Sequence, residues 1–337
     1  MADRRIYYFD VLNVISCFSV IALHCNGHVH SFDVADDGWW LHVLFEVAFF
    51  NAVPTFFMLS GATLLGYRRR YDTVTFFKRR CRKAFLPFLF WATVFFVLSV
   101  VTGWTELTPR TVAQAVLSCR IHYTDYWFFV PLFLLYLFMP FLSVMVAHLK
   151  EKEVLILALL IIGIQAVVNP VGQRVGAPWE LPIGGYVAYA LLGYYLAHTS
   201  WEKNKRVVLV ITALALFFMA TRYVCVLFSD AKSSVMFSYQ SLYAYFGSAA
   251  IFLIVKRICT RAWGGGISFL AGASFGVYLL QRLFVDGARL LIAKVTGVDD
   301  YHLCGWMLVL MTFVVYFSTV LIVRLLQRIP FVRHTVP

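Results

Sequence analysis

The stretch YYFDVLNVISCFSVIALHCNG, residues 7–27, decides the fold, because it is an almost continuous apolar run of membrane-spanning length. A helix needs about twenty predominantly apolar residues to cross a bilayer. Lipid offers the backbone no hydrogen-bond partners, so such a run must satisfy its own backbone groups as a helix. The run contains Asp10 and Asn13, which favours a retained helix over the apolar part of a cleavable signal peptide.

The rest of the chain has the same character. Of its 337 residues 61% are hydrophobic and 14% charged, whereas soluble domains are about 45–50% apolar and about 25% charged. We therefore predict an all-α, polytopic integral membrane helix bundle of about ten transmembrane helices, with Pro54 kinking the second. The predicted spans are residues 7–27, 39–65, 84–102, 127–147, 153–170, 182–198, 207–227, 239–255, 267–292 and 305–325.

The net charge of +12 is distributed unevenly over the predicted loops. With the N-terminus in the cytoplasm, the inner segments hold 21 basic residues and the outer loops five, with three more inside spans. This asymmetry follows the positive-inside rule and predicts that both termini lie inside. The basic excess is thereby assigned to a membrane topology, and nucleic acid is not expected as a partner because no recognition module is visible.

Cysteine and histidine spacings give little support to disulfides or metals. The seven cysteines include no C-x-x-C pair, so neither a disulfide framework nor a zinc ribbon is expected. His24 and His28 are four residues apart, with His30 and Asp33 close behind. No H-E-x-x-H pattern accompanies them, and we predict no metal site.

The first span carries a polar face. Asp10, Asn13, Cys17 and His24 fall on one side of a helix, since Asn13 and His24 differ by only about 20° around its axis. The face suits interhelical hydrogen bonds that hold a bundle together. An imidazole aligned with a carboxylate and an amide inside a membrane favours a functional role instead.

Further charges lie inside the predicted spans. Glu46 in the second span reaches a depth close to that of His24, and we predict that it orients the imidazole. A structural bond from Glu46 to a hydroxyl or to Arg222 is an equal alternative. Arg282 and Asp286 are four residues apart and are expected to pair.

The loop after the second span, YRRRYDTVTFFKRRCRKAFLP, holds eight basic residues. Such a loop can touch anionic lipid heads. It can also bind phosphates, because arginine forks bind them bidentately. The phosphate-site candidates are Arg68, Arg69, Arg79, Arg80, Arg82 and Lys83.

Several segments together resemble the acyltransferase-3 family of bacterial multipass membrane acyltransferases. They are YYFDVLNVISCFSVIALH at 7–24, AVPTFFMLSGATLL at 52–65, FFKRRCRKAFLPFLFW at 76–91, DYWFFVPLFLLYLFMP at 125–140, VAYALLGYYLA at 187–197 and SFGVYLLQRLF at 274–284. Each is weak alone, but their order is specific. The resemblance covers most of residues 1–337 and implies a single membrane-embedded acyltransferase-like domain in a bacterial plasma membrane.

The resemblance also implies an activity. Members are thought to move an acyl group from cytoplasmic acyl-coenzyme A, here with acetyl-coenzyme A favoured, to a hydroxyl of an extracytoplasmic carbohydrate or lipid-linked glycan. Acyl-coenzyme A is then a donor substrate, and no permanently bound cofactor is expected. The essential histidine of the family corresponds to His24. Its paired basic residues correspond to Arg80 and Lys83, or to Arg79 and Arg82.

The sequence departs from the family at three positions. Asn13 and Asn51 stand where arginine is usual, and Gln281 stands where histidine is common. Asparagine keeps hydrogen-bonding capacity without the charge. The substitutions leave open a donor bound differently, or a glycan or lipid transporter or flippase of the same fold without acyl transfer.

The polar residues of the spans and the family resemblance together predict one mechanism. His24 acts as general base on the acceptor hydroxyl, Glu46 orients it, and Asp10 and Asn13 line a path for the donor's arm. An oxyanion donor is required, and Asn51, Tyr126 and Tyr278 are the candidates.

Two aromatic residues, Tyr126 and Trp127, are the predicted contacts for the acceptor. Trp127 with Tyr126 can stack on a sugar, although an anchor at the membrane interface is the simpler role of Trp127. The lipid bilayer is a further partner, and a homo-oligomer is left open.

Overall fold

The computed structural model describes residues 6–27, 29, 38–119, 121–177, 181, 183–228, 237–261, 264–297 and 305–337. In these ranges the chain forms α-helices with short 3-10 and π-helical turns, and it has no strand. The predicted all-α fold is therefore confirmed. The predicted metal-spacing residues His28, His30 and Asp33 lie outside the described ranges.

The chain divides into two compact units, Met1–Arg70 with Phe138–Ala271, and Tyr71–Leu137 with Gly272–Pro337. The helices of the first unit are α1 (Tyr7–Cys25), α2 (Trp39–Phe49), α3 (Ala52–Leu64), α8 (Glu151–Gly163), α9 (Asn169–Arg174), α10 (Gly184–His198), α11 (Lys205–Leu227), α12 (Leu242–Ile258) and α13 (Gly265–Ala271). Those of the second are α4 (Thr73–Arg80), α5 (Leu86–Val101), α6 (Pro109–Ser118), α14 (Ser274–Thr296) and α15 (Gly305–Leu326). Helix α7 (Phe129–His148) begins in the second unit and ends in the first.

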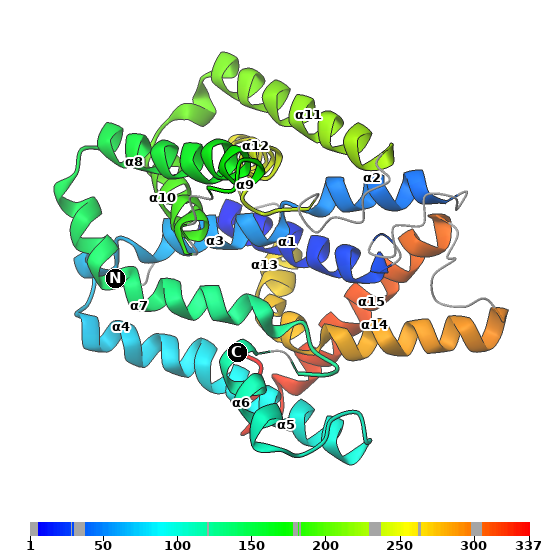
Figure 1. The fold of residues 1–337 in the computed structure, drawn as a ribbon. Coiled ribbons are helices and arrows are strands. Elements are labelled where there is room, and N and C mark those ends of the chain that lie inside the picture. Colours follow the sequence, from blue (N-terminus) through cyan, green and yellow to red (C-terminus); the bar gives the residue numbers. More distant parts are fainter. Residues whose placement is uncertain are drawn as a thin grey trace. The chain divides into compact units, whose positions relative to one another are not determined.

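Two glycines allow a close helix contact in the first unit, between α3 and α10 (Figure 1). A Cβ atom added at Gly61 would lie 1.8 Å from the backbone oxygen of Ala190. One added at Gly193 would lie 2.1 Å from the backbone oxygen of Met58. Small residues allow membrane helices to approach this closely, which maximises van der Waals packing where no hydrophobic effect drives association.

Helices α2 and α3 together form one apolar stretch that is interrupted at Phe50 and Asn51. Pro54 lies in the first turn of α3 and has no N–H to bond the carbonyl of Phe50. A helix boundary thus lies ahead of Pro54, and the predicted kink itself stays a prediction. This boundary places Asn51, the residue before α3, among buried neighbours within a membrane-spanning stretch.

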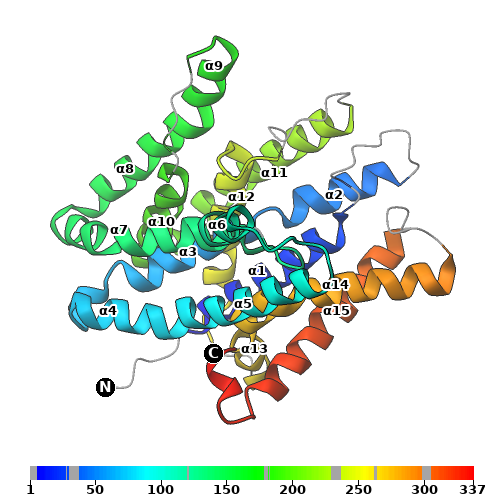
Figure 2. The ribbon, with the colours of Figure 1, turned by 60° about the horizontal axis from the view of Figure 1, so that its bottom comes forward.

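In the second unit α4 runs through a π-helical turn at Cys81–Phe85 into α5, and α14 packs along α15 (Figure 2). Aromatic rings fill the core between α5 and the start of α7, with Phe88 and Phe129 4.5 Å apart at their centroids. The C-terminal segment is fixed by a long-range bond from Trp91 Nε1 to the carbonyl of Thr335 and by a local one from Gln327 Nε2 to the carbonyl of Val336.

Among the described residues, seven helical stretches are long and apolar enough to cross a membrane, or eight if the pair Gly265–Ala271 and Ser274–Val295 forms one span. The predicted count of about ten is therefore not confirmed. Helices occupy the predicted places, but α10 has 15 residues and α12 has 17, fewer than the roughly twenty that a spanning helix needs. The span predicted at 267–292 is interrupted between α13 and α14.

Large apolar side chains cover the outside of several of these helices. On α11 Leu209 is 68% exposed and Phe217 63%. On α7 Phe141 is 74% exposed. Soluble proteins rarely expose apolar surface on this scale, and together with the seven stretches it identifies a membrane protein.

Candidate active site

The polar face of α1 is bonded to α13 at its N-terminal end. Ser268 Oγ donates to Asp10 Oδ2 at 3.0 Å, and Asn13 Nδ2 donates to the carbonyl of Ala271 at 3.3 Å. Ser16 and Cys17 farther along are buried. The face therefore points into the first unit, as the spacing predicts, and two of its polar groups hold a neighbouring helix. Whether Asp10 and Asn13 also act on a substrate stays a prediction.

His24 lies in the last turn of α1 and is half-buried. The helix ends at Cys25, where the backbone N–H of Asn26 bonds to the carbonyls of Ala22 and Leu23. Asn26 thus closes the turn that carries the imidazole. The hydrogen bonds of the Asn26 side chain therefore anchor this turn.

The side chain of Asn26 joins α1 to α2. Its Nδ2 donates to the backbone carbonyl of His42 at 2.8 Å and to Glu46 Oε2 at 3.3 Å. Its Oδ1 lies 2.6 Å from His42 Nδ1. All three residues are buried, with exposed fractions of 1–3%. Glu46 therefore accepts a hydrogen bond from Asn26, two residues beyond His24. That Glu46 orients the His24 imidazole stays a prediction.

The amide orientation fixes the tautomer of His42. Because Nδ2 of Asn26 faces two acceptors, the oxygen must face the imidazole, and Nδ1 of His42 must be the donor. In the neutral ring Nε2 is then the basic nitrogen. Sequence reasoning did not select Asn26 or His42. The four-residue spacing of His42 and Glu46, which puts both on one face of α2, was the signal available.

Asn51 is 2% exposed, and neither its Nδ2 nor its Oδ1 has a hydrogen-bond partner among the described residues. Its side chain lies against Gly247 of α12, where an added Cβ would come within 2.3 Å of Oδ1. Tyr243, one turn earlier on α12, is also 2% exposed, and the Ser241 side chain is the one hydrogen-bonding group recorded near its hydroxyl among the described residues, without the geometry of a full hydrogen bond. Arg222 lies over the Tyr243 ring, 5.1 Å from its centroid.

The other predicted oxyanion donors are engaged in the second unit. The hydroxyl of Tyr126 donates to the carbonyl of Leu279 at 2.8 Å, and that of Tyr278 donates to the carbonyl of Asp125 at 2.7 Å. A hydroxyl has one proton to donate, so neither is available to a substrate oxygen in this arrangement.

The ion pair predicted on the ninth span is confirmed. Arg282 Nε lies 3.0 Å from Asp286 Oδ1, four residues along α14. Arg282 also reaches Asp125 Oδ1 at 3.4 Å. These two contacts hold α14 to the segment that precedes α7. They also give the charges of Arg282, Asp286 and Asp125 partners of opposite sign in an apolar environment.

The basic loop begins with a capped helix. Asp72 precedes α4 and accepts from the backbone N–H of Thr75 at 3.3 Å, and hydrogen bonding by Thr75 lowers the pKa of Asp72. Arg79 stacks on Tyr71 with its guanidinium carbon 4.3 Å from the ring centroid, and that of Arg80 lies 5.9 Å from the Tyr136 ring.

The π-helical turn at Cys81–Phe85 carries Arg82 and Lys83. Such turns are rare and occur frequently at functional sites. Arg79, Arg82 and Lys83 are exposed and Arg80 is half-buried. Arg68 and Arg69, also exposed, belong to the other unit. The positive charge of this loop is therefore presented outward, where a phosphate can reach it.

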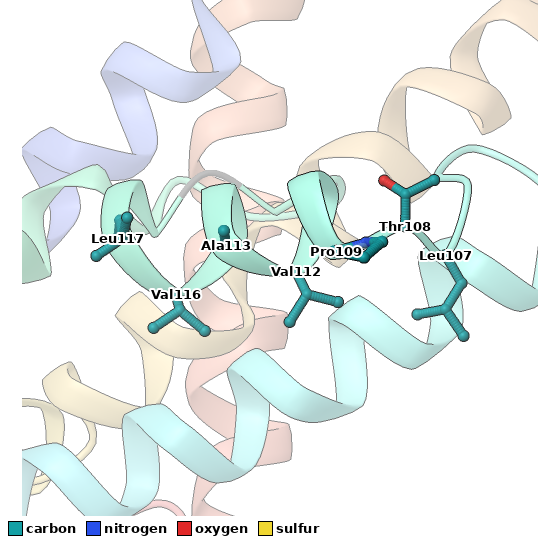
Figure 3. Close-up of a pocket in the computed structure, with 7 residues that line it drawn as sticks. All are labelled: Leu107, Thr108, Pro109, Val112, Ala113, Val116 and Leu117. Carbon is teal, nitrogen blue, oxygen red and sulfur yellow. The ribbon is translucent and has the colours of Figure 1, made fainter.

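Several surface hollows of the second unit lie beside α6. An open pocket of ≈ 430 Å³ is lined by Trp104, Thr105, Cys119, Ile121, His122, Thr124, Asp125, Tyr126 and Trp127. In it Trp104 stacks on His122 with the ring centroids 4.6 Å apart. Burial raises the pKa of the Cys119 thiol. Another hollow, formed by α6 itself, is lined almost wholly by apolar side chains such as Val112 and Val116 (Figure 3).

Comparison with known proteins identifies the family of this chain. A family model described as an acyltransferase domain matches residues 6–328, nearly the whole chain and parts of both units. No curated protein and no solved structure matches it. The sequence segments that resemble acyltransferase-3 proteins all lie inside the matched range. The chain therefore belongs to the acyltransferase-3 family, and it is a membrane acyltransferase that transfers groups other than aminoacyl groups.

Proposed function

We propose that this protein is a membrane O-acyltransferase that moves an acyl group, with acetyl favoured, from cytoplasmic acyl-coenzyme A to a hydroxyl of an extracytoplasmic carbohydrate or lipid-linked glycan. Membership of the family across residues 6–328 carries this proposal. We place the protein in a bacterial plasma membrane with both termini inside. The charge asymmetry of the loops supports that orientation.

In this reaction His24 is the general base. As the acceptor oxygen attacks the thioester carbonyl carbon, His24 takes the hydroxyl proton and the carbonyl π electrons move to the oxygen. The tetrahedral intermediate re-forms its carbonyl as the carbon–sulfur bond breaks, and the departing thiolate takes the proton from His24. Such proton transfers contribute roughly 10²–10⁴-fold to a rate. The half-buried place of His24 at the end of the polar face of α1 supports this role.

The donor binds at the basic loop. Exposed Arg79, Arg82 and Lys83 suit the phosphate groups of coenzyme A. Asp10 and Asn13, on the polar face of α1, line the path of its arm. Glu46 contributes through Asn26, which closes the turn beside His24.

The acceptor binds at the open pocket beside α6. Trp104 and Trp127 offer ring faces there, and His122 and Asp125 offer polar groups. Aromatic faces with nearby hydrogen-bonding groups are typical of sites for neutral polar ligands. The pocket thus supports a carbohydrate, which has both apolar faces and hydroxyls.

Transfer of labelled acetyl from acetyl-coenzyme A to surface glycans tests this function. Purified protein in proteoliposomes is expected to release free coenzyme A and to give glycans heavier by one acetyl group in mass spectra. His24→Ala is expected to abolish transfer while the protein stays monodisperse. His198→Ala is the control, because His198 is exposed and its Nδ1 bonds to the Tyr194 carbonyl of its own helix. Full activity of His24→Ala would contradict the base assignment.

A glycan or lipid transporter or flippase is the second candidate. The interruption between α13 and α14 favours it, because interrupted membrane helices are common at transporter substrate sites. A transporter moves labelled lipid-linked glycan across proteoliposomes without an acyl donor. Movement without coenzyme A release would replace the acyltransferase proposal by this one.

A further inference from the structure

The junction between α2 and α3 holds a side-chain amide that forms no hydrogen bond with the described residues. The backbone carbonyl of Asn51 accepts from Thr55 Oγ1 at 2.7 Å and from the Thr55 backbone N–H at 3.1 Å. The side-chain Nδ2 and Oδ1 are buried without a partner among the described residues. Folded proteins pair nearly all buried polar groups, because an unmade hydrogen bond there costs the full desolvation of the group.

Gly247 of α12 leaves the space that the Asn51 side chain occupies. A Cβ atom at Gly247 would lie 2.3 Å from Asn51 Oδ1 and 2.8 Å from its Nδ2. Any side chain at position 247 would therefore displace the amide. Glycine costs stability inside a helix, and here it leaves room for the Asn51 side chain against the helix backbone.

A second orphan group lies one turn away. Tyr243 and Gly247 are four residues apart on α12 and share one face of the helix. The Tyr243 ring lies 5.5 Å from the ring of Phe50, the residue before Asn51. Its hydroxyl is buried and makes no well-formed hydrogen bond in the described part of the chain, although the Ser241 side chain lies near it. An amide and a phenol from two helices thus have unmet hydrogen-bonding capacity in one region of the first unit.

The chemistry of this pair indicates its ligand. Asn51 and Tyr243 carry no charge themselves and together offer N–H and O–H donors, while the Arg222 guanidinium lies over the Tyr243 ring. The other two candidate oxyanion donors, Tyr126 and Tyr278, already donate their hydroxyl protons to backbone carbonyls. A neutral donor pair inside a membrane protein suits an oxygen that is uncharged in the ground state and becomes negative as it reacts.

We propose that Asn51 and Tyr243 bind the carbonyl oxygen of the acyl group during transfer, an inference that rests on the proposed acyltransferase function. When the acceptor oxygen attacks the carbonyl carbon, the π electrons move to this oxygen, and the two donors hydrogen-bond to it. When the carbon–sulfur bond breaks, the electrons return and the carbonyl re-forms. His24 holds the acceptor's proton between these two events and passes it to the thiolate.

A pair of tyrosine substitutions on α12 tests the inference. Tyr243→Phe removes the orphan hydroxyl, whereas Tyr245→Phe removes an equally buried hydroxyl that donates to the carbonyl of Gly185 at 3.4 Å. Loss of one oxyanion donor typically lowers kcat by about 10²–10³-fold. We expect Tyr243→Phe to lower kcat on this scale with the Kd for acetyl-coenzyme A unchanged, and Tyr245→Phe to keep wild-type kcat.

Asn51→Leu and Gly247→Ala provide the second test. Asn51→Leu keeps the volume but removes both polar atoms, so kcat is expected to fall while thermal stability is kept or rises. Gly247→Ala is expected to lower kcat by displacing the amide without changing any reacting group. If Gly247→Ala fails to fold, Asn51→Leu and Tyr243→Phe still test the proposed carbonyl site.

The outcomes separate this inference from the proposed function. If the wild-type protein transfers no acyl group, the proposed function fails. If the wild type is active and both Tyr243→Phe and Asn51→Leu keep its kcat, the carbonyl site is wrong while the function stands. A raised Kd for acetyl-coenzyme A with unchanged kcat would equally overturn it, because it would indicate ground-state binding only.

Discussion

Asn26 and His42 are bonded to each other twice, through Nδ2 to the backbone carbonyl and through Oδ1 to the ring Nδ1. A third bond from the same amide reaches Glu46 Oε2. One side chain thereby satisfies a main-chain oxygen, an imidazole and a carboxylate that are all removed from solvent. This amide holds the end of α1, where His24 lies, to α2.

Asn26→Ala is expected to destabilise the protein, because it leaves a buried imidazole N–H and a buried carboxylate without their partner. The loss is about 1–3 kcal/mol for each orphaned group. Thermal unfolding in detergent measures it. Asn169→Ala is the matched control, since the Asn169 Oδ1 has no partner among the described residues. Equal unfolding temperatures for the two variants would contradict a bridging role for Asn26.

Gly61→Ala and Gly193→Ala are expected to disrupt the packing of α3 on α10. The added methyl groups would meet backbone atoms at 1.8 and 2.1 Å, so the helices must separate. The expected readout is loss of monodisperse protein or a large fall in unfolding temperature. Gly163→Ala at the end of α8 is the control, because a Cβ there meets nothing within 4 Å. It is expected to be neutral or to stabilise by about 0.4–1 kcal/mol.

Lys256→Met is expected to weaken the first unit strongly. Lys256 Nζ donates to the carbonyls of Leu196, Ala197 and Thr199 at the end of α10 and pairs with Glu202 at 3.1 Å. The Lys256 and Glu202 side chains are 11% and 12% exposed. Breaking a buried ion pair from one side costs roughly 3–5 kcal/mol.

Exposed Lys205, on α11, is the control for that change. Lys205→Met is expected to alter the free energy of unfolding by less than about 0.5 kcal/mol. Glu202→Gln is expected to be milder than Lys256→Met, because the ammonium keeps its three carbonyls. A double-mutant cycle between positions 202 and 256 that gives no coupling energy would refute the pairing.

Arg79→Gln and Arg82→Gln are expected to raise the Kd for acetyl-coenzyme A and to make binding less sensitive to salt. Their charges are exposed, and screening acts most strongly on exposed charges. Titration of donor binding at two ionic strengths measures both effects. Arg110→Gln removes an exposed charge from the start of α6, outside the basic loop, and is expected to leave donor affinity unchanged. The same loss of affinity for Arg110→Gln would show a non-specific charge effect.

Much of the fold can be predicted from the lengths of the apolar runs in the sequence. The boundaries of α1 agree with the predicted first span because a single apolar run with polar flanks leaves few other places for a helix to begin and end. The number of spans does not follow so directly. Hydropathy continues through residues 267–292, whereas the helix stops between Ala271 and Ser274, and nothing in the average polarity of that run marks the interruption.

The candidate site was only partly predictable. Asp10, His24 and Glu46 stand out because charged or titratable groups are rare in apolar runs. Asn26 follows the apolar run and reads as a loop residue, and Tyr243 reads as one more core aromatic. Asn26 bonds to His42, 16 positions away, and Tyr243 packs against Phe50, nearly 200 positions away in the chain. Periodicity within one helix cannot report such neighbours.

The π-helical turn at Cys81–Phe85 makes the basic loop sensitive to chain length. One extra residue in a helical turn shifts the angular phase of everything before it by roughly 100°. Deleting a single residue there would restore the ordinary period and rotate α4 relative to α5, carrying Arg79 away from its present direction while leaving composition almost unchanged. Insertions and deletions in this segment would thus alter which face of the helix is positive, an effect that point substitutions cannot produce.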